Sequence, residues 1–169
     1  MEEIENLGTN EAFAAALVAR MLGKVERFNR EVVDLPIPGT PTILSDDRTN
    51  WARAALREEL DEFSEACKAE DVLEAADALV DLAYFALGRL IEMGVPAQAV
   101  IDGVQQANMA KQKGELSKRP GSLGHDAIKP EGWTPPDHSW LLGFDLSDVS
   151  ELERLRKQES EREAISPVW

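Results

Sequence analysis

The sequence predicts an all-α protein, a four-helix bundle-like domain with an irregular segment and a tail helix near its C-terminal end. Two observations lead to this prediction. Long stretches are rich in Ala, Leu, Glu and Arg, which favour helices, and Pro- and Gly-containing breaks separate them. No stretch of useful length alternates apolar and polar residues as a half-buried strand would. The length of 169 residues suits one main domain.

The first predicted helix extends from about Asn10 to Val33 and is followed by a proline-rich loop from Leu35 to Pro41. Proline lacks a backbone donor and pushes the preceding residue toward extended geometry, so this segment cannot be helical. The second helix begins at Ser45, Asp46 or Asp47, any of which can act as N-cap, and continues to about Ala69.

The third helix opens at Asp71, where Asp71-Val72-Leu73-Glu74 fits a capping box, and stops near Met93 because Gly94 and Pro96 follow. The fourth helix is predicted from Pro96 to about Lys113, ahead of Gly114. The connections are short, which predicts that helices two, three and four are antiparallel neighbours.

Residues 114–140 form an irregular segment that contains both histidines, His125 and His138. A charged helix from Ser147 to about Ala164 is expected after it. We therefore divide the chain into a domain over residues 1–140 and a charged helical tail over residues 141–169.

The formal net charge is −14 at pH 7, which disfavours nucleic acid and anionic lipid as partners. No apolar stretch approaches the length of a membrane span, and the N-terminal residues do not resemble a secretory signal. The single cysteine, Cys67, cannot form an internal disulfide. These features predict a cytoplasmic protein.

The third helix carries apolar residues on nearly all sides between Val72 and Met93, so it should be buried all round. With few helices available to cover it, we expect a homo-oligomer. Against this apolar background Glu74, Asp77 and Asp81 form one stripe, because spacings of three and four residues share a helix face.

The second helix offers a matching acidic group. Glu59 and Glu62 lie on the shoulder of its apolar face beside small alanines, whereas Glu58 and Glu65 face farther outward. Converging carboxylates repel one another at low dielectric, so a positive partner is required. Oxygen ligands without cysteine or helical histidine suit Mg²⁺ or Mn²⁺. The alternative is that these side chains form ordinary salt bridges or face water.

Four ordered motifs resemble the MazG-like all-α nucleoside triphosphate pyrophosphohydrolases, and in particular their small phage-type branch. Glu58-Glu59-Leu60-Asp61-Glu62 followed by Glu74-Ala75-Ala76-Asp77 matches the family's central signature. Asp81 and Tyr84 match the residues that usually follow this signature in the family. The other matches are Phe28-Asn29-Arg30, Asn108-Met109-Ala110-Lys111, and Lys129-Pro130 with Pro135-Pro136-Asp137. Gln105 stands where relatives often have a histidine.

The resemblance implies hydrolysis of a nucleoside triphosphate to a monophosphate and pyrophosphate, with Mg²⁺ or Mn²⁺ held by Glu59, Glu62, Glu74 and Asp77. Either Glu58 or Asp81 could accept the proton of the attacking water. It also implies control of the deoxynucleotide pool, guanine nucleotides as one substrate preference, and a homodimer or homotetramer.

Several residues are candidates for substrate binding. Lys111 and Lys129 could contact phosphate oxygens, since an acidic protein needs local cations for them. Asn108 could read a sugar or base edge, and Phe28 and Trp51 could stack on a base, although core packing is the more ordinary role of such aromatics.

Two other classes of protein remain open. A di-iron carboxylate bundle also places glutamates on facing helices, but it uses Glu-x-x-His pairs that this chain lacks. A non-enzymatic acidic interaction protein would spread its charges over the surface and would show no metal-dependent turnover.

Overall fold

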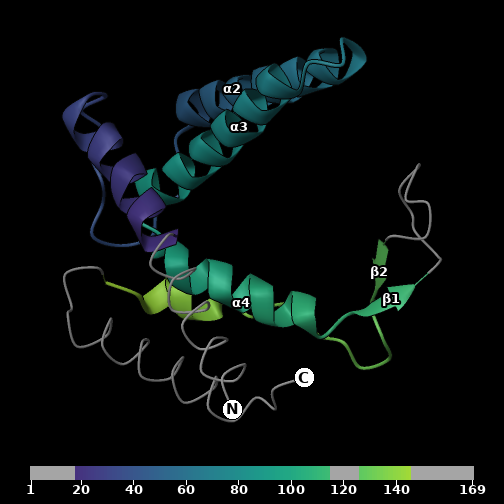
Figure 1. Ribbon diagram of the computed structural model, residues 1–169. Helices are drawn as coiled ribbons and strands as arrows, with labels where there is room; N and C mark the ends of the chain where they lie inside the picture. Colours follow the sequence, from purple (N-terminus) through teal and green to yellow (C-terminus); the bar gives the residue numbers. More distant parts are fainter. Residues whose placement is uncertain (1–17, 115–125, 146–169) are drawn as a thin grey trace, which may run out of the picture.

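The computed structural model describes residues 18–114 and 126–145, which are mostly helical (Figure 1). The first described helix covers residues 18–31. It is followed by α2 (Asp46–Lys68), α3 (Val72–Glu92), α4 (Ala97–Met109), the short strands β1 (Gln112–Gly114) and β2 (Asp126–Ile128), and the 3₁₀ helix η1 (Ser139–Gly143). The all-α prediction is confirmed. The predicted start of the first helix at Asn10 and the tail helix from Ser147 lie outside the described residues.

The ends of α2 and α3 follow the capping signals in the sequence. Ser45 is the N-cap of α2, where its Oγ accepts a hydrogen bond from the Arg48 backbone N–H at 3.3 Å. Asp71 caps α3 and accepts hydrogen bonds from the backbone N–H groups of Leu73 at 3.0 Å and Glu74 at 3.1 Å. The backbone N–H of Asp71 donates to the Ala66 carbonyl at 2.9 Å, so the Glu74 side chain is not needed to complete the cap.

Helices α2 and α3 form an antiparallel pair joined by a tight turn (Figure 1). Most of the residues that they bury are small: Ala52 and Ala66 on α2, and Ala78 and Gly88 on α3; Ile91 and Glu92 are also buried, at the end of α3. Small side chains let two helices approach closely, because less side-chain volume separates their backbones. The pair is therefore held by close backbone approach and contains few large core residues.

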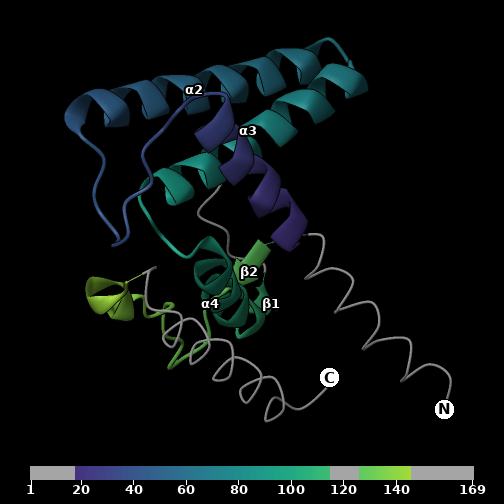
Figure 2. The same ribbon diagram turned by 90° about the vertical axis from the view of Figure 1, so that its left-hand side faces the viewer.

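The helix over residues 18–31 crosses this pair where α2 begins and α3 ends (Figure 2). Val25 is fully buried there, and the buried Asn29 donates a hydrogen bond from Nδ2 to the Gly88 carbonyl at 3.0 Å. A buried amide of this kind fixes the register of the crossing helix, since leaving it unpaired would cost roughly 1–3 kcal/mol.

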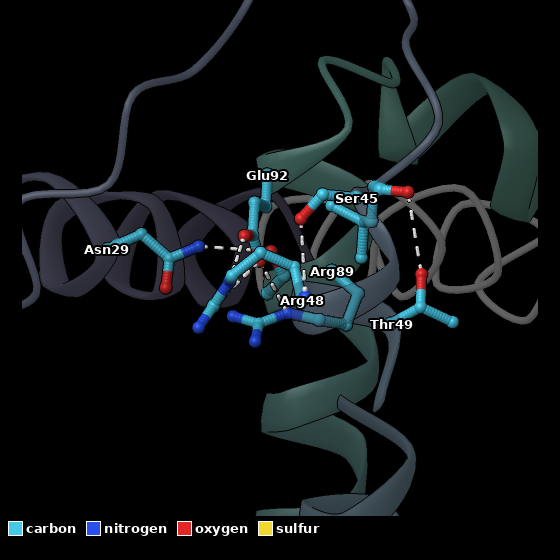
Figure 3. Close-up of polar contacts among 8 residues, drawn as sticks. Asn29, Ser45, Arg48, Thr49, Arg89 and Glu92 are labelled. Carbon is cyan, nitrogen blue, oxygen red and sulfur yellow. Dashed lines mark hydrogen bonds and ion pairs between the residues drawn. The ribbon is translucent and has the colours of Figure 1, made fainter. Parts of the chain in front are cut away.

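A buried ionic cluster joins α2 to the end of α3 (Figure 3). The Glu92 side chain is only 6% exposed, and it accepts hydrogen bonds from Arg48 Nε at 2.6 Å and Arg48 Nη2 at 3.2 Å. Arg89 Nε lies 3.0 Å from the second oxygen of Glu92. Removing one member of a buried pair typically costs about 3–5 kcal/mol, so this cluster clamps the open end of the helix pair.

Helix α4 departs from two predictions. It ends at Met109 rather than near Lys113, because the chain turns into β1, which pairs with β2 in antiparallel register from Gln112 opposite Ile128 to Gly114 opposite Asp126. It also leaves the α2–α3 pair after Gly94 instead of lying along it (Figures 1 and 2). The expectation that α4 is an antiparallel neighbour of both helices was therefore wrong.

The C-terminal described segment folds back on α4. His138 approaches Gly103 so closely that a Cβ built there would lie 3.2 Å from its Cε1 atom. Phe144 is 2% exposed and makes an edge-to-face contact with Trp140, with ring centroids 5.6 Å apart. Residues 139–144 thus pack on the helical part, while the domain boundary at residue 140 stays a prediction.

Over residues 18–114 and 126–145, none of the helices combines the length and hydropathy that crossing a bilayer requires.

Replacing Gly94 with alanine is expected to destabilise the fold by about 2 kcal/mol or more. Gly94 has a φ of +68°, and an added Cβ would lie 2.6 Å from the Pro38 carbonyl oxygen. Chemical denaturation should show a lower midpoint for the variant.

Gly88→Ala is the matched control. Its added Cβ would lie 3.5 Å from Val25 Cγ1, an ordinary contact, so removing a helical glycine should raise stability by about 0.5–1 kcal/mol. Equal destabilisation by both variants would contradict this account.

Candidate active site

Acidic side chains from α2 and α3 meet in the middle of the antiparallel pair. Glu59 on α2 is half-buried, whereas Glu58, Glu62, Asp77 and Asp81 are exposed. Glu59 and Glu62 share a face of α2, and Asp77 and Asp81 share a face of α3, because residues three or four apart lie one above the other on a helix. The pairing of the two helices makes these faces neighbours.

The electrostatics of Glu59 show that the two faces are close. Burial raises the pKa of the Glu59 carboxyl above its ordinary value, and repulsion from Glu62, Asp81, Glu58 and Asp77 raises it further. Two of these groups lie on α3, so the field at Glu59 comes from both helices. The structure therefore places Glu58, Glu62, Asp77 and Asp81 within electrostatic range of Glu59.

The fifth predicted residue, Glu74, lies one turn nearer the α2–α3 loop and is exposed. It is not among the groups that raise the pKa of Glu59. Its backbone N–H is used by the Asp71 cap, and its side chain is not required there. Glu74 thus belongs to the rim of the acidic group.

Of the two ordinary alternatives, salt bridges are not what the described residues show, whereas exposure to water is what five of these six carboxylates show, all except Glu59. Ion pairs on these helices join Arg57 to Asp61, Lys68 to Glu65, and the two arginines to Glu92. Among residues 18–114 and 126–145, no basic side chain comes within 4.0 Å of the carboxylates that we predicted as catalytic or metal-binding, or of Asp81. Their mutual repulsion is therefore not offset by a neighbouring lysine or arginine in the described part of the chain.

The chemistry of this donor set suits a hard divalent cation, since it consists of carboxylate oxygens without sulfur or imidazole. Within the described residues, no three His, Cys, Asp or Glu side chains are arranged to share one ion. The carboxylates are close enough to repel but do not form a preassembled coordination shell. The metal-ligand set Glu59, Glu62, Glu74 and Asp77 stays a prediction.

The predicted substrate-binding residues gather elsewhere, at the end of α4. Lys111 Nζ donates to Asn108 Oδ1 at 2.7 Å. The ammonium groups of Lys111 and Lys129 lie 5.6 Å and 4.1 Å from the centre of the Trp133 ring, and Trp133 Nε1 donates to the Ala107 carbonyl at 2.8 Å. This end of α4 lies away from the α2–α3 pair (Figures 1 and 2).

Trp133, around which these three residues gather, is a residue that sequence reasoning missed. Nothing in its local pattern indicates that it lies between two lysines, because Lys111 and Lys129 are joined only by the pairing of β1 with β2. The tryptophan holds the two cations near each other through cation–π contacts.

Phe28 and Trp51 are each partly exposed, at 40% and 44%. Phe28 packs edge-on against Tyr84, with centroids 5.7 Å apart, and Trp51 packs edge-on against Phe85 at 5.9 Å. Both aromatics therefore contact α3 with one edge while leaving part of the ring accessible.

Replacing Glu59 with glutamine is expected to stabilise the metal-free protein at neutral pH and to lose this advantage as the pH falls. A carboxyl with a raised pKa favours folding in its protonated form, so its contribution is present at low pH and lost as the pH rises through the folded-state value. Thermal unfolding of both proteins in a chelator from pH 4 to 8 measures the difference. An advantage of the variant that grows toward low pH would contradict the assigned repulsion.

Comparison with known proteins adds a likeness to a family. No curated protein matches the chain in sequence. Residues 25–108 match the model of the family described as phosphoribosyl-ATP pyrophosphohydrolase, a stretch that contains both acidic faces and ends at Asn108. Lys111 and Lys129 lie beyond it. These residues are thus similar to a pyrophosphohydrolase family acting on nucleotide-like substrates, within the MazG-like all-α nucleoside triphosphate pyrophosphohydrolase superfamily.

Proposed function

We propose that this protein is a metal-dependent nucleoside triphosphate pyrophosphohydrolase that converts a ribo- or deoxynucleoside triphosphate to a monophosphate and pyrophosphate. The observation that carries the proposal is the crowding at Glu59, where carboxylates of two helices face one another without a basic partner in the described chain. A cation with a bound triphosphate would relieve that repulsion.

Glu59, Glu62, Glu74 and Asp77 would hold Mg²⁺ or Mn²⁺. The cation supplies charge neutralisation to the phosphate oxygens and makes a water molecule more acidic. In the reaction the water oxygen bonds to the α-phosphorus, the bond from that phosphorus to the bridging oxygen breaks, and pyrophosphate leaves with the electron pair. Glu58 or Asp81 would take the water's proton, since both lie close enough to Glu59 to affect its pKa.

Asn108, Lys111 and Lys129 would contact the substrate from the end of α4. That group lies away from the acidic faces of its own chain, so we propose that a second copy brings the two groups together. Each lysine carries an ammonium suited to phosphate oxygens that the cation does not cover.

The substrate is proposed from two sources. The resemblance to small phage-type enzymes favours deoxynucleotides, guanine nucleotides among them, and a role in nucleotide pool control in the cytoplasm. The matched family's description names phosphoribosyl-ATP, which is itself a nucleoside triphosphate derivative and is therefore a second candidate.

Incubation with each canonical ribo- and deoxynucleoside triphosphate, and with phosphoribosyl-ATP, in Mg²⁺ or Mn²⁺ is expected to yield monophosphate and pyrophosphate. Glu59→Gln should lower kcat at least 100-fold, because it removes a proposed ligand charge. Chromatography of the products measures the reaction. Diphosphate with orthophosphate would contradict attack at the α-phosphorus, and no turnover would favour a non-enzymatic acidic interaction protein.

Glu65→Gln is the matched control, because Glu65 lies on the outer side of α2 and pairs with Lys68. It should retain activity. Addition of Mn²⁺ should raise the melting temperature of the wild type and of this control but not of Glu59→Gln, since a ligand that binds only the folded state stabilises it. An equal shift in all three proteins would place the cation elsewhere.

We also propose a homodimer or homotetramer. Large apolar side chains on the α2–α3 pair are exposed, among them Leu60 at 51%, Leu79 at 45% and Val80 at 55%. A soluble chain rarely leaves such a face open to water, and a second copy of the pair would cover it.

Light scattering is expected to give two or four times the chain mass. Val80→Glu should shift the protein toward the monomer, because a charge would have to be buried at the interface. A monomeric wild type at micromolar concentration would contradict this proposal.

A further inference from the structure

The Trp133 side chain is fixed by a turn that precedes it and by the end of α4. Its backbone N–H donates to the Pro130 carbonyl at 3.1 Å, and Gly132 between them has a φ of +78°. These two features fit a type II β-turn, whose third residue is typically glycine. The indole Nε1 donates to the Ala107 carbonyl at 2.8 Å. The ring therefore has a defined place beside α4.

The indole N–H serves a carbonyl group at the end of α4. Ala107 is among the last four residues of that helix, whose carbonyls have no donor within a regular helix. The Lys111 N–H would continue the helical pattern, but it donates to the Asn108 carbonyl at 3.0 Å instead. Trp133 thus takes the place of the missing helical donor, and the same side chain carries the ring that contacts two lysines.

The two lysines reach this ring from different parts of the chain. Lys129 lies just before the turn, with its Nζ 4.1 Å from the ring centre, and Lys111 follows α4, with its Nζ at 5.6 Å. Ammonium groups within about 6 Å of an indole centre are attracted to its face. Lys111 Nζ also donates to Asn108 Oδ1 at 2.7 Å. Both ammonium groups are therefore held beside one ring.

Neither of these ammonium groups is paired with a carboxylate in the described chain. The ion pairs found over residues 18–114 and 126–145 involve other basic side chains. This is unexpected in a protein of net charge −14, where acidic partners are abundant. An aromatic face attracts an ammonium group without cancelling its charge, and it leaves N–H groups free to donate. Two positive charges thus remain available to an anion with several oxygen atoms.

We propose that Trp133 is a positioning residue for the phosphate groups of the substrate and acts through Lys111 and Lys129. The proposal rests on the function proposed above and adds a residue to its binding site. A lysine side chain loses rotamer freedom when it binds a ligand, and contact with the ring removes part of that freedom in advance. Trp133 therefore strengthens phosphate binding without contacting the reacting atoms.

Calorimetric titration of the full chain with Mg²⁺–pyrophosphate measures this binding without any turnover. Trp133→Leu should weaken pyrophosphate binding roughly tenfold, because both cation–π contacts are lost. Trp133→Phe keeps an aromatic face and should bind more tightly than Trp133→Leu, although it lacks the indole N–H. Lys113→Met is the matched control, since this exposed lysine of β1 has no ring contact among the described residues, and it should bind like the wild type.

A double-mutant cycle separates positioning from a merely structural role. In a Lys129→Met background, Trp133→Leu should weaken pyrophosphate binding only roughly threefold, because the contact with Lys111 alone is left to lose. An equal loss in both backgrounds would overturn the proposal. So would unchanged binding in Trp133→Leu, or a wild type that binds no pyrophosphate.

Gly132→Ala provides a second variant in case Trp133→Leu fails to fold. An added Cβ at Gly132 meets no atom within 4 Å, so the substitution strains only the turn, at its positive φ, and keeps the indole. It should weaken pyrophosphate binding several-fold by displacing the ring from Lys129. Binding equal to that of the wild type would contradict the positioning role.

The two proposals fail in different ways. If both are correct, Trp133→Leu raises KM for the triphosphate roughly tenfold and leaves kcat unchanged, since it removes binding that the ground state and the transition state share. Pyrophosphate binding that depends on Trp133, without hydrolysis of any triphosphate, would reject the enzymatic function and leave the positioning role standing. Hydrolysis with the same KM in the wild type and Trp133→Leu would support the function and reject the positioning role.

Discussion

Close packing of α2 against α3 through small residues is the constraint on which the rest of the structure depends. Alanines at 52, 66 and 78 let the two backbones approach, so side chains beside them are forced together. On one face this brings like charges within range of Glu59. On the outer faces it leaves larger apolar residues in water. One choice of packing thus accounts both for the repulsion at Glu59 and for the exposed apolar residues.

The distribution of charged side chains also changes along the length of the α2–α3 pair. Near its middle it carries a group of carboxylates without basic partners in the described chain, whereas its open end holds two arginines against one buried glutamate. Glu92 stabilises that end because it accepts hydrogen bonds from Arg48, and a buried charge without such partners would be costly.

The direction of α4 separates the two groups of residues that we propose to bind one substrate. The turn at Gly94 directs α4 away from the α2–α3 pair. At the far end of α4, Lys111 and Lys129 both lie near the Trp133 ring, and Lys111 donates a hydrogen bond to Asn108, so these residues form a separate cationic group. Positive and negative halves of the proposed site are therefore held apart within one copy. Assembly of copies would serve both to cover the apolar surface and to join these halves.

Local signals in the sequence were sufficient for the helices, because caps such as Ser45 and Asp71 and the breakers at Gly94 and Pro96 act over a few residues. Helical spacing likewise predicted that Glu59 and Glu62 share a face, and Asp77 and Asp81 another. The end of α4 was misjudged, since pairing of β1 with β2 joins residues 12 to 16 positions apart. Only the tertiary structure could place Arg89 between Glu92 and the Trp51 ring of α2, because burial depends on which helices cross and not on any local pattern.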